Sequence, residues 1–268
     1  MKKIIKNLDL RTIADSGQCF RFYETEDGVF DVFTTDRFLR IYKISNNEFD
    51  FKCTKKEFEF FENYFDLKTD YNKFSRVCVD SDKFLKKCIE YSKGLRILNQ
   101  DKFEMVISFI ISQRKSIKAI RTSIERLSKL CGKKCKSEFG DYYAFPTAEQ
   151  IVKTSRSKLI SCGLGYRLEY IVDFCKDYLM GKYDLESFSK LSNEELLDSL
   201  MKIKGVGLKV ASCVALFAYH RLDICPKDVW INRVIDKKYK GKFPDRYNKY
   251  AGIIQQYWFN YSHIEKDL

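Results

Sequence analysis

EELLDSLMKIKGVGLKVASCVALFAYHRLDICPKDVWINRVI, residues 194–235, is the stretch of the chain that decides the fold. Its apolar spacing predicts a helix that ends at Ile203 and a second helix that begins near Leu208. The turn between them holds Gly205 and Gly207, which let the backbone approach a neighbouring molecule and leave helix amides free to hold a phosphate oxygen. A plain αα-hairpin, with one glycine ending a helix and the other permitting packing, explains the turn equally well.

Two charged residues stand at the starts of the helices in this stretch. Lys209 lies in the first turn of the second helix, where the positive end of the helix dipole disfavours an extra proton on an amine and favours a nucleophilic lysine. Asp228 follows Pro226 at the mouth of the next helix, so the two side chains could share one cleft. Each also has a simpler role: Lys209 as a phosphate contact, and Asp228 as a helix N-cap that can still face a substrate.

The chain before the hairpin divides into two parts with different periodicity. Residues 19–53 alternate in the manner of strands, with turns at Asp27-Gly28 and Asn46-Asn47, and predict a small antiparallel sheet. From about residue 101 the strand signals vanish and helical spacing continues, with a break near residues 112–116. The pattern predicts an α+β protein.

We therefore expect two domains. The first, residues 1–95, is an antiparallel sheet with flanking helices, and the second, residues 96–268, is a helical bundle that contains the hairpin at residues 194–221.

Composition and charge narrow the class of function. With 268 residues and 45% hydrophobic residues, the chain can bury a core, which excludes wholesale disorder. The formal net charge is +12, and residues 201–268 hold 13 basic against 6 acidic residues, which indicates a surface facing a polyanion or, more simply, a solvated basic face. The chain has no apolar run long enough for a membrane span or a signal peptide, so we expect a soluble cytoplasmic protein.

The ten cysteines are scattered, and in a reducing compartment we expect buried thiols and not disulfides. Only Cys213 and Cys225 follow the hairpin, so we predict no iron–sulfur cluster, which needs four closely spaced cysteines. Cys131 and Cys135 lack a second pair, and the chain has two histidines, so we predict neither a zinc site nor a histidine-based triad.

The hairpin motif G-V-G-x-K-V-A-x-C, followed by P-x-D-V, resembles the helix-hairpin-helix (HhH-GPD) DNA glycosylase superfamily, and its lysine and cysteine resemble the 8-oxoguanine DNA glycosylase family in particular. Three further segments resemble family landmarks in the same order: SGQCFR at 16–21, GLGYR at 163–167 and AGIIQQYWF at 251–259. The resemblance implies a TBP-like N-terminal sheet followed by a helical glycosylase domain, and it suggests a bacterial protein associated with the nucleoid.

The resemblance also implies a bifunctional enzyme that acts as a monomer, without a cofactor, on double-stranded DNA containing oxidised guanine. Lys209 would attack C1′ of the damaged nucleotide, displace the base and form a Schiff base whose β-elimination nicks the strand. Asp228 would stabilise the positive charge that develops on the sugar. Two alternatives stay open: a monofunctional glycosylase for alkylated bases, which uses the aspartate with water, and a non-catalytic HhH DNA-binding protein.

Four residues match positions of the family that hold the flipped base. The carbonyl of Gly17 would accept the N7 hydrogen that distinguishes 8-oxoguanine from guanine, and Gln255 would read the Watson–Crick edge. Cys213 and Phe259 would sandwich the base. Without the resemblance, the sequence indicates a turn glycine at Gly17, an inert packing cysteine at Cys213 and a core aromatic residue at Phe259.

Other matches concern the duplex. Tyr166 matches the wedge near the estranged base, and Arg167 an arginine that reads the opposite base. Arg114 stands where the family has the asparagine that fills the vacated space, and Ala119 where a second opposite-base arginine is expected. These departures predict a relaxed preference for the base opposite the lesion.

The hairpin itself would contact DNA through Gly205 and Gly207, and Trp230 replaces a histidine, so that a phosphate contact is altered or replaced by stacking. If the hairpin binds an ion as in the family, its ligands would be the backbone carbonyls of three residues: Met201, Ile203 and Val206.

Overall fold

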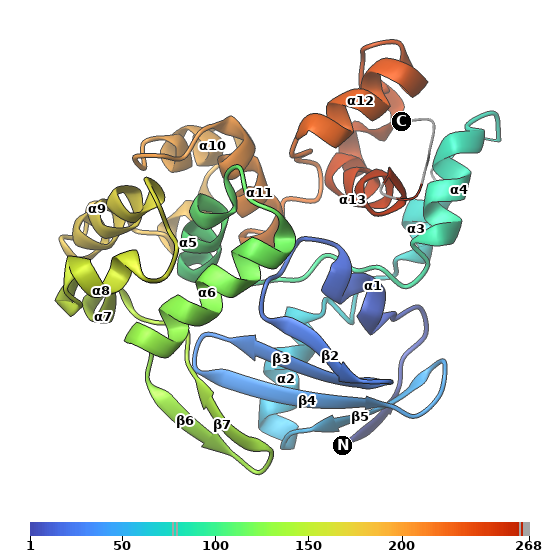
Figure 1. Cartoon of the computed structure of the whole chain (residues 1–268). Helices are drawn as coiled ribbons and strands as arrows, with labels where there is room; N and C mark the ends of the chain where they lie inside the picture. The colour runs from blue at the N-terminus through green and yellow to red at the C-terminus, as the bar shows by residue number, and fades with distance from the viewer. Residues whose placement is uncertain (77, 79, 263, 265–268) are drawn as a thin grey trace.

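The computed structural model describes residues 1–76, 78, 80–262 and 264. These residues form an antiparallel sheet at one end of the molecule and a group of helices at the other (Figure 1). The predicted α+β class is confirmed. None of the described helices is long and apolar enough to cross a membrane.

Five strands form the N-terminal sheet: β1 (Lys2–Ile4), β2 (Phe22–Glu26), β3 (Val29–Thr34), β4 (Arg37–Lys43) and β5 (Glu48–Lys52). Neighbouring strands are all antiparallel, in the order β1-β5-β4-β3-β2. The predicted turn at Asp27-Gly28 joins β2 to β3, and Gly28 takes a φ of +74°, which a glycine adopts without strain. The sheet is confirmed, but β1 lacked a sequence signal because it has three residues and depends on its pairing with β5.

Two helices lie against or beside this sheet. Helix α1 (Leu10–Asp15) leads into β2, and α2 (Lys55–Tyr64) packs on the sheet, with the rings of Phe51 and Phe58 5.1 Å apart at their centroids. The alternation of strand residues explains this packing, since Phe49 and Phe51 point to one face of the sheet and are fully buried.

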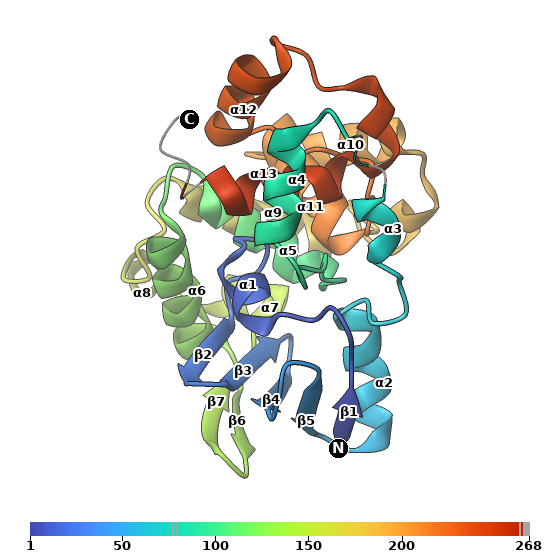
Figure 2. The same ribbon diagram turned by 90° about the vertical axis from the view of Figure 1, so that its right-hand side faces the viewer.

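Helices α3 (Asn72–Ser75) and α4 (Lys83–Tyr91) follow in the chain, but α4 packs against α13 (Ala251–Ser262), the last helix (Figures 1 and 2). The carboxylate of Asp82, at the start of α4, accepts hydrogen bonds from the hydroxyls of Tyr239 and Tyr247. Residues from the first third of the chain therefore pack against the last helix. The domain boundary at residue 95 stays a prediction.

The second half is mainly helical, as predicted. Its helices are α5 (Lys102–Ser112), α6 (Ile117–Cys131), α7 (Ala148–Lys153), α8 (Arg156–Ile160), α9 (Arg167–Leu179), α10 (Asn193–Met201), α11 (Leu208–Ala218), α12 (Val229–Tyr239) and α13, with 3₁₀ turns at Ser187–Lys190 and Asp245–Tyr250. The break predicted near residues 112–116 separates α5 from α6, and the hydroxyl of Ser116 caps α6.

The expectation that strands end before residue 101 is wrong. A second, two-stranded sheet joins β6 (Lys134–Ser137) to β7 (Gly140–Tyr143). Each strand has four residues, too few for a period to show, and the hairpin is held by the first sheet, where the Phe38 and Tyr142 rings lie 5.5 Å apart. The β6–β7 hairpin therefore depends on a tertiary contact with the first sheet and not on its local sequence.

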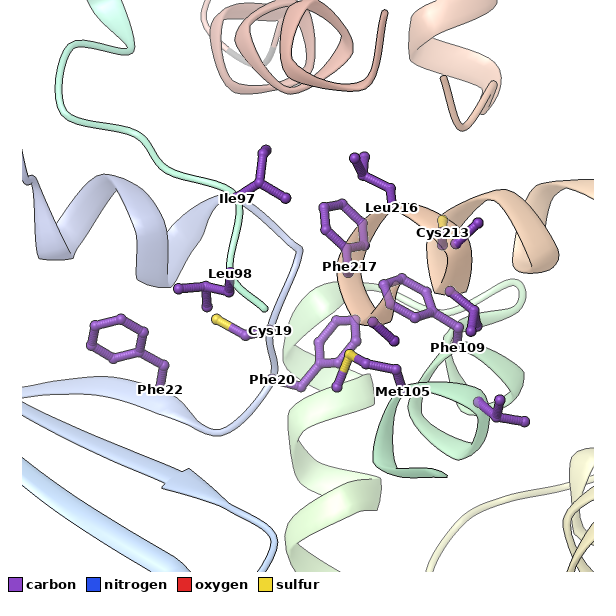
Figure 3. Packing of buried hydrophobic residues seen from close by; sticks show 14 of the residues in the cluster. Cys19, Phe20, Phe22, Ile97, Leu98, Met105, Phe109, Cys213, Leu216 and Phe217 are labelled. Carbon is purple, nitrogen blue, oxygen red and sulfur yellow. The ribbon is translucent and has the colours of Figure 1, made fainter. Parts of the chain in front are cut away.

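Helices α5 and α11 run through the centre of the protein, and their residues are almost all buried. Phe109 of α5 joins them to the N-terminal part: its ring lies 5.5 Å from Phe20 and 5.6 Å from Phe217 of α11. Figure 3 shows these three rings gathered in one cluster between segments far apart in the sequence. This packing fixes the N-terminal end of α11 at the surface, beside residues of the N-terminal domain.

Candidate active site

The hairpin between α10 and α11 is a tight turn whose two glycines have different roles. Gly205 has a φ of +85°, and a Cβ on it would lie 2.3 Å from the ring of Tyr170. A side chain at this position is therefore excluded twice, by the backbone conformation and by the packing of α9. Gly207 is the N-cap of α11, and a Cβ there would meet no atom within 4 Å. The start of α11 is thus open to solvent, with its first amides unpaired by the helix.

Lys209 lies at this open end. The residues from Val210 to Ala218 are buried, whereas Lys209 is exposed. Its Nζ lies 5.8 Å from the centroid of the Phe109 ring and takes part in no ion pair among the residues that the structure describes. The amine therefore reaches the mouth of a pocket from a rigid helix without a carboxylate that holds it in place.

Asp228 caps α12, as predicted: its Oδ1 accepts a hydrogen bond of 2.9 Å from the amide of Ile231. Within the described part of the chain, the other carboxylate oxygen accepts no hydrogen bond. Asp228 and Lys209 line the same pocket, which has a volume of about 570 Å³. The cap fixes the carboxylate in place and leaves one oxygen for a group that enters the pocket.

The pocket brings together residues from both halves of the chain. Of the residues predicted for catalysis and base reading, it is lined by Lys209, Asp228, Gly17, Cys213, Gln255 and Phe259, and Trp230 lines it too. Its remaining lining includes the aromatic cluster of Phe20, Phe109 and Phe217. Sequence reasoning missed these three, because buried phenylalanines have no pattern that separates a pocket floor from an ordinary core.

A narrow contact joins Gly17 to Phe259. Gly17 has a φ of +73°, and a Cβ on it would stand 3.2 Å from Cε1 of the Phe259 ring. The backbone of the loop after α1 can therefore lie directly against this aromatic ring, which only glycine permits. Cys213 lines the same pocket from α11, and burial raises the pKa of its thiol to about 11, so the thiol is protonated at neutral pH.

Lys115 is a further pocket residue that sequence reasoning missed. Its Nζ donates to the hydroxyl of Ser123 and to the carbonyl of Gly163, both at 2.6 Å. Burial, followed by the nearby Arg167 and Arg126, lowers the pKa of Lys115 below its ordinary value. The signal that could have found it is its place in the break between α5 and α6.

Tyr166 and Arg167 lie outside the pocket lining. Tyr166 is exposed, and the guanidinium of Arg167 stands 4.4 Å over its ring. Arg167 itself is buried, and it donates to the backbone carbonyls of Gln113 and Leu164. In this structure the guanidinium therefore ties two loops together and faces away from solvent. Arg114 is exposed and has a φ of +51°, uncommon for a residue with a side chain.

Three loops are connected by these hydrogen bonds: residues 113–116, residues 161–166 and the hairpin turn. Gln113 donates its amide to the carbonyl of Gly205 at 3.1 Å and accepts from Arg167 at its own carbonyl. Lys115 completes the set through Gly163. The loops that carry the predicted DNA contacts are thus one bonded unit.

Trp230 lies in the first turn of α12, with the guanidinium of Arg233 5.0 Å from its ring. In the hairpin turn, the carbonyl of Ile203 accepts a hydrogen bond from the amide of Val206 at 2.9 Å. The turn is therefore closed by its own backbone, and an ion held by the carbonyls of Met201, Ile203 and Val206 stays a prediction.

Two family models match consecutive parts of the chain. Residues 2–106 match the N-terminal domain of 8-oxoguanine DNA glycosylase, and residues 107–253 match the HhH-GPD superfamily of base excision DNA repair proteins. The chain belongs to the 8-oxoguanine DNA glycosylase family. This family membership confirms the resemblance drawn from the hairpin, and with it the enzyme class of N-glycosylase/DNA lyase.

Relatives of known structure cover almost the whole chain. MBOgg1, solved in complex with a low-affinity DNA ligand, is 32% identical with a TM-score of 0.91, over 97% of this chain and 93% of that one. The 8-oxoguanine glycosylase/lyase of Clostridium acetobutylicum, in complex with double-stranded DNA containing cytosine opposite 8-oxoguanine, is 31% identical with a TM-score of 0.89, over 96% and 92% of the two chains.

A curated relative from Methanothermobacter thermautotrophicus, a probable N-glycosylase/DNA lyase, is 29% identical over an alignment of 231 residues that covers 75% of this chain and 73% of that protein. The similarity thus reaches both domains and extends beyond the hairpin motif.

Proposed function

We propose that this member of the family excises 8-oxoguanine from duplex DNA and then cleaves the strand at the resulting abasic site. The observation that carries the proposal is the shared pocket: an exposed amine that forms no ion pair with a described residue and a capping carboxylate open into the same 570 Å³ space as the residues matched to base reading. A glycosylase of this kind needs a nucleophile, an anion and a slot for an extruded base in one place.

The reaction follows from the chemistry of Lys209 and Asp228. The lone pair of the Lys209 nitrogen forms a bond to C1′ while the bond from C1′ to N9 breaks, and the electron pair of that bond leaves with the base, which takes up a proton. The free oxygen of Asp228 stabilises the positive charge on the sugar as that bond breaks. The lysine nitrogen then loses a proton, and its lone pair forms the second C1′–N bond of a Schiff base while the bond from C1′ to O4′ breaks, so that the sugar ring opens and O4′ takes up a proton. Loss of a C2′ proton from this Schiff base then expels the 3′ phosphate and nicks the strand.

The other side of the pocket would hold the base. The Gly17 carbonyl accepts the N7 hydrogen, and the protonated thiol of Cys213 and the ring of Phe259 cover the two faces of the purine. Gln255 reads the Watson–Crick edge. A thiol and an aromatic ring form apolar walls, which suit a planar base taken out of the stack.

DNA is the proposed partner, bound by a monomer and within the cytoplasm. The open amides at the start of α11 suit a phosphate, and the sequence of residues 201–268, with 13 basic against 6 acidic residues, has the excess of positive charge that suits a polyanion. Arg167 is bonded to backbone carbonyls, and Ala119 supplies no second arginine, so we propose a relaxed preference for the base opposite the lesion.

Trapping with borohydride tests the proposal. A duplex containing 8-oxoguanine, incubated with the protein and borohydride, should give a covalent adduct, because borohydride reduces the Schiff base to a stable amine. Lys209→Gln should give none, whereas Lys202→Gln, which removes an exposed lysine of the same hairpin, should give as much as the wild type. Base release without strand cleavage would indicate a monofunctional glycosylase, and salt-sensitive binding without turnover on any lesion would indicate a non-catalytic module.

A further inference from the structure

Helix α13 presents two consecutive glutamines to the pocket, although base reading was assigned to one of them. Gln255 and Gln256 are both 3% exposed, and both line the pocket. The side-chain nitrogen Nε2 of Gln256 donates a hydrogen bond of 3.1 Å to Oε1 of Gln255. The second glutamine therefore touches the residue that would read the base.

Burial of the Gln256 side chain is energetically unfavourable. Its own Oε1 is inaccessible to solvent and has no hydrogen-bond partner among the described residues. Burial of an amide oxygen without a partner costs free energy that a leucine of similar size would avoid. Packing therefore does not explain a glutamine here, whereas its side-chain hydrogen bond to Gln255 has a direct consequence.

That hydrogen bond orients the amide of Gln255. Its Oε1 is turned toward Gln256, and its Nε2 donates no hydrogen bond within the described part of the chain. Two N–H donors are thus left for a base in the pocket, together with the second lone pair of the oxygen. If Gln255 alone rotated, two NH₂ groups would face each other and the bond would be lost.

The two classes of purine differ at the edge that this amide meets. A 6-oxopurine presents the O6 acceptor beside the N1–H donor, whereas a 6-aminopurine presents an exocyclic donor beside the N1 acceptor. An amide whose N–H group faces the substituent at C6, and whose oxygen faces N1, forms hydrogen bonds with a 6-oxopurine. With a 6-aminopurine the same amide places donor against donor and acceptor against acceptor. Loss of such a pairing leaves buried polar groups unmatched, which is a strong basis for rejection.

We propose that Gln256 is a positioning residue that holds the Gln255 amide in the orientation for 6-oxopurines, so that the pocket accepts 8-oxoguanine and rejects 8-oxoadenine. The inference rests on the proposed function, since it concerns the base that enters the same pocket. Gln256 acts through its neighbour and need not touch the base.

Single-turnover excision from duplexes with 8-oxoguanine or 8-oxoadenine tests this role. The wild type should strongly prefer 8-oxoguanine. Gln256→Leu removes the donor and should slow 8-oxoguanine excision about tenfold, as expected for one lost hydrogen bond. The preference for 8-oxoguanine over 8-oxoadenine should decrease at the same time. Gln256→Glu, assayed at pH 8, offers only acceptors, so it should turn the Gln255 nitrogen away from the pocket and shift the preference toward 8-oxoadenine.

A preformed abasic site separates this role from a structural one. Strand cleavage there involves Lys209 but no base, so Gln256→Leu should cleave it at the wild-type rate. Tyr257→Phe removes a polar atom from the neighbouring residue, which lines a different hollow, and should leave both assays unchanged.

The outcomes distinguish the two proposals. If the wild type excises neither base, the proposed function fails. If it excises 8-oxoguanine but Gln256→Leu keeps both the rate and the preference, the positioning role alone is overturned. A wild-type preference for 8-oxoadenine would also overturn it, because that result requires both amides to be rotated together.

Discussion

The two sides of the pocket are built in different ways. The proposed reacting side consists of Lys209 and Asp228 at the starts of α11 and α12, helices that are close in the sequence. The proposed reading side consists of Gly17, Gln255, Gln256 and Phe259, which come from opposite ends of the chain. A local turn and a helix cap fix the first, whereas the second needs the whole core. Chemistry can therefore be encoded locally, while selectivity depends on global packing.

The largest effect should come from the reacting side. Asp228→Asn should lower excision of 8-oxoguanine about 100-fold, because the anion that stabilises the sugar cation is lost. Thermal stability should hardly change, since asparagine caps a helix as well as aspartate does. Asp9→Asn alters an equivalent cap on α1, outside the pocket, and should leave excision unchanged. Equal losses in the two variants would mean that the Asp228 carboxylate acts only as a cap.

On the reading side, Gly17→Ala should slow excision roughly 30-fold, about 2 kcal/mol, because a Cβ at positive φ displaces the Phe259 ring from the slot. Cleavage of a preformed abasic site should persist, which would show that the two sides separate. Gly28→Ala, in the β2–β3 turn at a similar φ, is the control for backbone strain. If both assays fell together for Gly17→Ala, the division between the sides would be wrong.

Cys213 belongs to the comparison because it lies on α11, with Lys209, yet lines the part of the pocket proposed to hold the base. Burial raises the pKa of its thiol to about 11. The folded state therefore binds this proton more tightly than the unfolded state, and stability present below pH 9 is lost as the pH rises toward 11. Between pH 9 and pH 11, the unfolding free energy of the wild type should therefore fall by about 1–2 kcal/mol more than that of Cys213→Ala, as measured by urea denaturation at each pH. Parallel losses would show that the thiol is not sealed in the folded state.

The smallest effect should come from Arg167, which joins loops and belongs to neither side. Arg167→Met should slow excision about threefold, and equally opposite all four bases, because it loosens the bonds to Gln113 and Leu164 without removing a base contact. Arg156→Met removes an exposed arginine at the start of α8 and should have no effect. A loss confined to one opposite base would instead make Arg167 a reader of that base.

The sequence predicted the reacting side better than the reading side. The hairpin, the cap at Asp228 and the break between α5 and α6 follow from local rules of turns, caps and periodicity, and the structure confirms them. The β6–β7 hairpin was missed because contacts with the first sheet decide it.

Gln256, Lys115 and the inward turn of Arg167 were also beyond local rules. Each is defined by a partner far away in the chain or by an unmatched atom inside the core, and periodicity carries neither kind of information. Family resemblance located Gly17 and Phe259, but the contact between them appears only when both ends of the chain are folded.

The packing of α4 against α13 has a consequence for the order in which the protein matures. Domains tend to fold from the N-terminus as the chain is synthesised, yet α4 has to wait for the last helix to cover it. The turn with Lys209 leaves the ribosome before α13 does, so a nascent chain carries the proposed nucleophile before it has Gln255. On the proposed division of the pocket, the groups that read the base are thus completed after the groups that react.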